Sequence, residues 1–195
     1  MMVRNYDSSR RRKAAGQTRR DILRAALKLH WQGVTEYDAI AGEAGCSVAT
    51  VRKHFPTKED LFQGCTRAFA ETLDMPDLDA LARVPDTGER IRSTVQELCR
   101  IHAAMFGYAW LSARLGGDSP TLEAEMAAYA GLTDAVAELL APSASPRASL
   151  VRGLLDFLTY RALRLSGELS DDEAAEALTS AIAALLIGRD EHPGS

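Results

Sequence analysis

The stretch TEYDAIAGEAGCSVATVRKHF, residues 35–55, reads as two short helices joined by a tight turn. Gly45 ends the first helix, because glycine readily adopts the left-handed backbone that closes a helix. Ser47 can cap the second helix by accepting a hydrogen bond from a free backbone N–H, and Pro56 stops it. Apolar residues at helical spacing predict one buried face on the first helix: Tyr37, Ile40, Ala41 and Ala44.

The second helix is about two turns long, and its two sides differ in chemistry. Val51 and Phe55 point inward, with Val48 at the edge of that face. The other side carries small, hydroxyl and cationic side chains: Ala49, Thr50 and Lys53, flanked by Arg52 and His54. Such a face suits the DNA major groove, where small residues permit close approach and longer polar ones reach base edges or phosphates.

Length and composition indicate a cytoplasmic globular protein. The chain has 195 residues, of which 46% are hydrophobic, enough for a real core. No apolar run approaches the roughly 18 residues of a membrane helix, so no membrane association is expected. The basic N-terminus has no apolar stretch after it and does not read as a secretory signal. Three cysteines, an odd number without metal-like pairing, fit a reducing compartment.

Charge is distributed very unevenly along the chain. The formal net charge is −4, but residues 1–70 carry +6 and residues 71–195 carry −10. All four lysines lie in the first part: Lys13, Lys28, Lys53 and Lys58. This asymmetry predicts that one end meets a polyanion, although a solvated basic tail beside an acidic domain would give the same numbers.

The helical patterns predict an all-α chain in three segments. Residues 1–16 read as a flexible basic arm, residues 17–60 as the DNA-binding domain, and residues 61–190 as a helical domain. The arm contains Arg4, Arg10, Arg11, Arg12 and Lys13, which could follow phosphates or enter the minor groove.

Helix boundaries follow from capping residues, prolines and glycines. We expect a helix over 17–32 with Thr18 as its cap, and Thr35 as the cap of the next. Thr57 should cap a helix that reaches Leu73, and residues 77–86 should form a connector. Further helices are expected over 87–115, with Gly107 as a kink or an end, and over 120–140, 147–166 and 170–188.

Residues 18–69 resemble the DNA-binding domain of the TetR (tetracycline-repressor-like) family of bacterial transcription regulators. The resemblance rests on TRRDILRAA at 18–26, IA at 40–41, AGCS at 44–47, TV at 50–51 and HFPTKEDL at 54–61. It implies an N-terminal three-helix domain with a helix-turn-helix, followed by a helical domain for ligand binding and dimerisation. It also implies a non-enzymatic regulator without cofactor or metal.

The resemblance carries DNA-binding roles to particular residues. Three fall where the family reads bases: Val48, Ala49 and Arg52. Five fall where it grips phosphates: Thr35, Thr50, Lys53, His54 and Lys58. Two departures matter: the segment from Gly33 to Ile40 is about two residues shorter than usual, and Arg52 replaces the usual tyrosine. Arg52 suggests a distinct operator, with a bond to guanine.

Aromatic and soft side chains gather between the two ends of the chain and suggest a pocket for a small apolar or amphipathic effector. The candidate ligand-binding residues are His102, Met105, Phe106, Trp110, Tyr129, Phe157 and Arg161. For any one of these residues, core packing is the simpler explanation. Cys99 and His102 lie three apart on one helix, but two ligands without a third do not make a metal site.

The last two helices predict a homodimer. Residues 147–166 place Leu150, Leu154, Leu158, Ala162 and Leu165 on one face, and the helix over 170–188 is apolar nearly all round. Such a helix needs partners on more than one side, and the resemblance to TetR-like proteins implies that both helices pair with a second subunit in a four-helix bundle; burial within one monomer is the alternative. The resulting hypothesis is a ligand-responsive repressor on a pseudo-palindromic operator. The alternatives are a helical small-molecule-binding protein or enzyme with a basic N-terminus, and an activator with the same DNA-binding head.

Overall fold

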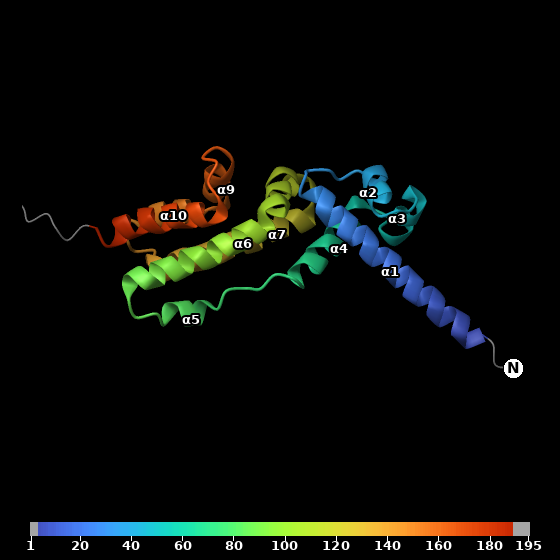
Figure 1. Ribbon diagram of the computed structural model, residues 1–195, viewed down its shortest axis with the longest axis horizontal. Coiled ribbons are helices and arrows are strands. Elements are labelled where there is room, and N and C mark those ends of the chain that lie inside the picture. The colour runs from blue at the N-terminus through green and yellow to red at the C-terminus, as the bar shows by residue number, and fades with distance from the viewer. Residues whose placement is uncertain (1–3, 189–195) are drawn as a thin grey trace, which may run out of the picture. The chain divides into compact units, whose positions relative to one another are not determined.

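The computed structural model describes the backbone of residues 4–188 and the side chains of residues 12–188. The side chains of Arg4, Arg10 and Arg11 in the predicted arm, and residues 189–190 of the predicted second domain, lie outside this description. Residues 4–188 form helices and connections without a strand, which confirms the predicted all-α class (Figure 1). None of the described helices is long and apolar enough to cross a membrane.

The chain divides into two compact units, which interleave along the sequence. Unit 1 comprises the residues up to Thr72 together with Gly107–Met126, and unit 2 comprises Leu73–Phe106 together with the residues from Ala127 onward. Two helices, α6 (Thr87–Leu115) and α7 (Pro120–Leu140), contribute residues to both units. Unit 1 is therefore larger than a domain limited to residues 17–60.

Unit 1 contains the helix-turn-helix region. Its first four helices are α1 (Arg4–His30), α2 (Tyr37–Glu43), α3 (Val48–His54) and α4 (Lys58–Ala70). Helix α1 packs against α2 and α4, and α2 packs against α3 (Figure 1). The core between them joins apolar side chains from these helices and from the second segment of the unit, including Ile22, Ile40, Val51, Phe55, Leu61, Tyr108 and Leu122.

Four predicted details of the helix boundaries in unit 1 are wrong. The basic segment that we expected to be a flexible arm continues α1 from Arg4 onward. Thr18 is consequently interior, and its hydroxyl donates to the Ala14 carbonyl at 3.0 Å rather than capping the helix. Helix α2 has Glu36, not Thr35, at its N-cap, and the Glu36 carboxylate accepts from the Thr35 N–H at 3.0 Å. Helix α4 ends at Ala70, before the predicted end at Leu73.

Gly107 lies inside the continuous helix α6 and is neither a kink nor an end. Its lack of a side chain serves a close approach within unit 1. A Cβ atom at this position would lie 2.4 Å from the Trp31 Cα atom and 2.8 Å from its Cβ atom. Helix α6 ends instead at Leu115, where η1 (Gly116–Asp118) begins. The glycine was interpreted from local propensity, but packing between helices explains its presence.

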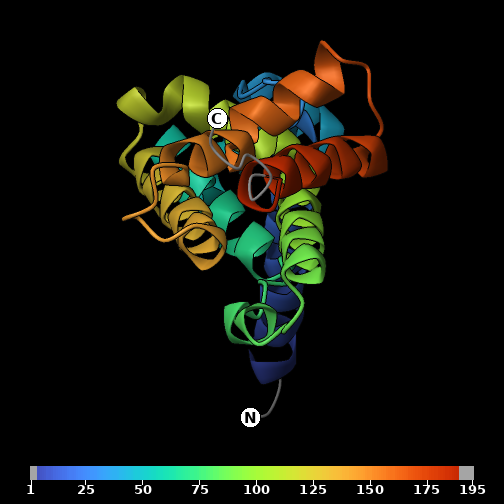
Figure 2. The same ribbon diagram turned by 90° about the vertical axis from the view of Figure 1, so that its left-hand side faces the viewer.

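Unit 2 combines parts of α6 and α7 with α5 (Leu78–Ala82), α8 (Ala148–Leu155), α9 (Phe157–Leu165) and α10 (Asp171–Leu186). Helix α5 occupies part of the predicted connector. The final helix runs alongside the part of α6 that belongs to this unit (Figures 1 and 2). The core gathers Ile91, Val95, Leu98, Val136, Val151, Leu155, Tyr160, Leu178 and Ile182.

The single helix predicted over 147–166 is interrupted at Asp156. This residue has extended backbone dihedrals, and its carboxylate caps α9 by accepting from the Leu158 N–H at 2.7 Å. The interruption leaves the Leu155 carbonyl free to accept from the Nε2 atom of His102 at 3.0 Å. The apolar periodicity runs through this point without change, so the sequence pattern could not reveal the break.

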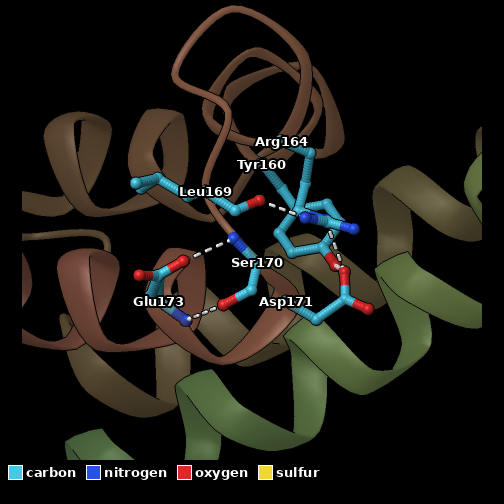
Figure 3. Close-up of polar contacts among 6 residues, drawn as sticks. All are labelled: Tyr160, Arg164, Leu169, Ser170, Asp171 and Glu173. Atoms are coloured by element: carbon cyan, nitrogen blue, oxygen red, sulfur yellow. Dashed lines mark hydrogen bonds and ion pairs between the residues drawn. The ribbon is translucent and has the colours of Figure 1, made fainter.

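Side chains from both helices stabilise the turn between α9 and α10. Asp171 accepts from the Tyr160 hydroxyl and pairs with Arg164 Nε, both at 2.5 Å, while Arg164 also contacts the Leu169 carbonyl (Figure 3). Ser170 and Glu173 form the capping box that begins α10, with Ser170 as the predicted cap (Figure 3).

Candidate nucleic-acid interface

Helix α3 is held by local capping and by its buried face. Gly45 has a φ of +66°, as the turn requires, and the Ser47 hydroxyl oxygen accepts from the Thr50 N–H at 3.1 Å. Val51 and Phe55 are almost completely buried, at 0% and 1% exposure. These contacts confirm the predicted orientation of the helix and leave its opposite face toward solvent.

The outward face of α3 carries the six predicted DNA-binding residues of this helix. Ala49, Arg52 and Lys53 are exposed, and Val48, Thr50 and His54 are half-buried. Two cations and small side chains thus share a surface that no helix of unit 1 covers. The arrangement can approach a groove closely and present guanidinium and ammonium donors to acceptors there.

The two remaining predicted DNA-binding residues contact each other. Lys58 Nζ donates to the Thr35 hydroxyl at 3.2 Å, which joins the start of α4 to the residue two places before α2. Lys58 is exposed, whereas Thr35 is buried with 8% exposure. The start of α4 is fixed by a capping box between Thr57 and Asp60, whose hydrogen bonds lower the pKa of Asp60. Lys58 therefore presents its charge from a well-defined helix terminus.

Tyr37 lies next to the predicted base-reading residue Arg52, a relation that the sequence did not reveal. The Arg52 guanidinium carbon lies 5.2 Å from the centroid of the Tyr37 ring. The Tyr37 hydroxyl donates to the Phe55 carbonyl at 2.9 Å, at the C-cap of α3. A groove of about 500 Å³ runs beside this pair. Its lining is Glu36, Tyr37, Asp38, Val48, Arg52, Pro56, Thr57 and Lys58.

Glu59, in the first turn of α4, joins that helix to the start of α7 within unit 1. Its carboxylate accepts from the Ser119 hydroxyl at 2.7 Å and from the Thr121 N–H at 2.9 Å, and it also contacts the Thr121 hydroxyl. These hydrogen bonds, led by the one from Ser119, lower the pKa of Glu59. The carboxylate anchors the helix terminus that carries Lys58. No sequence signal links residues 60 positions apart.

Replacing Glu59 with glutamine should destabilise unit 1. The variant keeps the side-chain size but turns charge-assisted hydrogen bonds into neutral ones and brings an NH₂ group near the Thr121 N–H. We expect a loss of about 1–2 kcal/mol in the free energy of unfolding at pH 7. Urea unfolding followed by tryptophan fluorescence measures it, because Trp31 and Trp110 both belong to unit 1. Glu123→Gln, at an exposed position of α7, is the control; equal stability of the two variants would contradict the role of Glu59.

Most of the predicted ligand-binding residues gather in unit 2, where their rings pack against one another. Phe157 lies 5.9 Å from His102, 5.9 Å from Phe106 and 6.2 Å from Tyr129 between ring centroids. Met105 is buried and Arg161 is half-buried in the same unit. Trp110 belongs to unit 1, whereas the other six residues belong to unit 2.

His102 is buried at the centre of this aromatic cluster. Its Nε2 atom contacts the Leu155 carbonyl, its Nδ1 atom contacts the Tyr129 hydroxyl, and burial lowers its pKa to about 4. Both ring nitrogens thus have protein partners, and the ring is neutral at pH 7. An effector that uses His102 as a polar anchor must displace one of these partners.

Comparison with known proteins identifies the helix-turn-helix. Residues 22–65 match the family model described as bacterial regulatory proteins, tetR family. Residues 22–65 are thus similar to the N-terminal domain of TetR-family regulators. The match covers the end of α1, all of α2 and α3, and most of α4, so the exposed face of α3 described above lies within the matched segment.

Solved structures similar to this chain extend the likeness to the rest of the fold. A TetR-like transcriptional regulator from Rhodococcus sp. RHA1 is 20% identical with a TM-score of 0.63, over 88% of this chain and 97% of that one. Another transcriptional regulator from the same organism is 20% identical with a TM-score of 0.62, over 90% of this chain and 99% of that one. No curated protein matches the sequence. At this identity the likeness concerns the fold alone.

Proposed function

We propose that the protein is a ligand-responsive repressor that binds a pseudo-palindromic operator as a homodimer. The observation that carries the proposal is the outward face of α3, where Arg52 and Lys53 are exposed while Val51 and Phe55 anchor the helix. Each subunit would insert α3 into one of two successive major grooves. The net charge of +6 over residues 1–70 favours the approach to DNA.

The residues of the interface divide into two roles. Val48, Ala49 and Arg52 read base edges in the major groove. Phosphates are bound by Thr35, Thr50, Lys53, His54 and Lys58. The contact between Lys58 and Thr35 supports a shared phosphate site, because it places an ammonium group and a hydroxyl together at the start of α4.

Lys53→Ala tests this proposal. Removing one phosphate contact should weaken operator binding several-fold and reduce the slope of log K against log salt by about one. A gel shift on the DNA that flanks the gene, repeated over a salt series, measures both quantities. Lys28→Ala is the matched control, because Lys28 already pairs with Glu43 at 2.7 Å. An unchanged footprint and slope for Lys53→Ala would reject its role.

Exposed leucines on α8 and α9 support the homodimer. Leu150, Leu158 and Leu165 are 58%, 53% and 52% exposed, while Val151 and Leu155 beside them are buried. These leucines belong to the predicted stripe, which the structure divides between two helices at Asp156. Burying large apolar side chains against a second copy is favourable by about 25 cal/mol per Å². Helix α10 adds small side chains that permit close approach of a partner helix: Ala177, Ala181 and Ala184.

Leu158→Glu should convert the dimer into monomers. A carboxylate in a packed apolar interface loses its hydration, so we expect the dimer dissociation constant to rise at least tenfold. Sedimentation velocity over a concentration series measures the change. Met75→Glu is the matched control, because Met75 is equally exposed, at 55%, outside the two helices. Dimers of unchanged affinity in Leu158→Glu would place the interface elsewhere.

The effector site is proposed at the aromatic cluster of unit 2. Its residues would be His102, Met105, Phe106, Tyr129, Phe157 and Arg161; Trp110, the seventh residue of the predicted set, belongs to unit 1. Their chemistry suits a small apolar or amphipathic molecule. Such a molecule releases DNA only if it binds the released geometry more tightly than the DNA-bound one. Electron density for a ligand in crystals grown with candidate compounds would test this site.

A further inference from the structure

The Tyr37 side chain contacts α3 at two points, through its hydroxyl group and through the face of its ring. The hydroxyl donates to the Phe55 carbonyl, which fixes the phenol against the C-terminus of α3. The ring is 8% exposed, and its face supports the Arg52 guanidinium at 5.2 Å. A cation placed over an aromatic face at this distance is attracted to it. Tyr37 is therefore a fixed aromatic platform beneath the exposed Arg52 guanidinium.

We propose that Tyr37 is a positioning residue that holds Arg52 for reading a guanine at one position of each operator half-site. This inference rests on the proposed function, since it needs α3 to enter the major groove. The guanidinium is planar and matches the O6 and N7 acceptors of guanine with two parallel donors. Stacking on Tyr37 restricts the rotamers of the long side chain before DNA arrives. The ordering cost of binding falls accordingly.

The charges around Arg52 leave its donors available to DNA. Glu36 and Asp38 line the same groove, yet neither forms an ion pair with Arg52 among the pairs of the described residues. Arg52 itself is exposed. Lys53, its neighbour, lacks such a platform among the described ring contacts and offers a compact charge suited to a phosphate. The two adjacent cations thus have different roles. Arg52 recognises a base, and Lys53 strengthens binding to DNA of any sequence.

Selection of binding sites from randomised DNA by the full-length protein tests the role of Arg52. The wild-type protein should select sites with one guanine at symmetric positions of the two half-sites. Arg52→Ala and Arg52→Lys should both lose this preference, and Arg52→Lys should keep the salt dependence because it keeps the charge. Unchanged guanine selection by Arg52→Ala would overturn the inference. A wild-type protein that selects no sequence would instead refute the proposed function.

Replacing the ring at position 37 tests the platform itself. Tyr37→Phe keeps an electron-rich ring, whereas pentafluorophenylalanine at this position keeps the shape and reverses the charge of the ring face. We expect the fluorinated variant to discriminate guanine from the other bases about three- to tenfold less well than Tyr37→Phe. Binding to random DNA should be equal for the two. Equal discrimination by the two variants would overturn the positioning role, and a uniform loss on all sequences would indicate a merely structural one.

A double variant, tested by the same selection, shows whether the Tyr37 ring acts through its contact with Arg52 or through its packing in unit 1. If Tyr37 acts through Arg52, the fluorinated ring should have no further effect on base preference in the Arg52→Ala background. Additive losses would show that Tyr37 influences reading by another route, and the inference would then fail. Tryptophan fluorescence of each variant verifies that unit 1 is folded, since both tryptophans belong to it.

Discussion

Gly107→Ala should destabilise unit 1 by about 3 kcal/mol, although alanine favours a helix more than glycine does. The new methyl group would lie 2.4 Å from the Trp31 Cα atom, far inside contact distance. Trp31 cannot yield easily, because its N–H bonds to the Leu27 carbonyl and the following turn bonds back to His30. The strain therefore falls on two backbones, not on a flexible side chain.

Gly16→Ala provides the matched control for this variant. Gly16 also lies inside a helix of unit 1, but a Cβ atom there would meet only the Arg20 guanidinium at 3.7 Å. This substitution should be neutral or stabilise the unit by up to about 1 kcal/mol. Urea unfolding followed by tryptophan fluorescence compares the two. Equal unfolding midpoints would show that α6 and Trp31 do not approach as closely as described.

Acid should destabilise unit 1 through His30. This histidine is fully buried, neither ring nitrogen has a hydrogen-bond partner, and burial, followed by the charge of Lys58, lowers its pKa to about 4. The unfolded chain binds the proton near the ordinary pKa of 6.5, so the folded state loses stability as the pH falls from 6.5 toward 4. Between pH 7.5 and pH 5 the loss from this residue should be roughly 2 kcal/mol.

His30→Leu isolates that contribution. Leucine of similar size removes an unsatisfied polar ring from among Phe62 and Tyr108, so the variant should equal or exceed the wild type at pH 7.5. Its stability should fall less steeply toward pH 5, while the carboxylates titrate alike in both proteins. Urea unfolding at the two pH values measures the difference. Parallel losses in both proteins would mean that His30 takes up its proton without cost in the folded state.

The sequence predicted the helix-turn-helix well because its signals are local. Gly45, Ser47 and Thr57 act within one turn of their own position, and each has the expected geometry. The periodicity of Val51 and Phe55 likewise follows from a single helix axis. Local rules of capping and spacing are sufficient wherever the structural cause lies in neighbouring residues.

Features that depend on distant residues escaped prediction. Gly107 was interpreted as a helix breaker because its reason, the Trp31 backbone, lies 76 positions away. The partners of Glu59 and the stacking of Arg52 on Tyr37 are likewise set by tertiary packing. The interruption at Asp156 was hidden by a leucine repeat that continues across it. For Gly107, Glu59 and Arg52 a residue of another element explains the observed arrangement, whereas the Asp156 cap is local and was masked by the apolar repeat around it.

The interruption at Asp156 determines which side chains of α9 face the core and which face solvent. Helix α8 buries Val151 and Leu155, four residues apart, and an unbroken helix would continue that series near residues 158–159 and 162. The chain instead buries Phe157 and Tyr160 and turns Leu158 outward. One carboxylate therefore determines which side chains the C-terminal half displays and which it conceals. Inserting or deleting a single residue within α9 would rotate the side chains that follow by about 100° and would change which of them can face a partner.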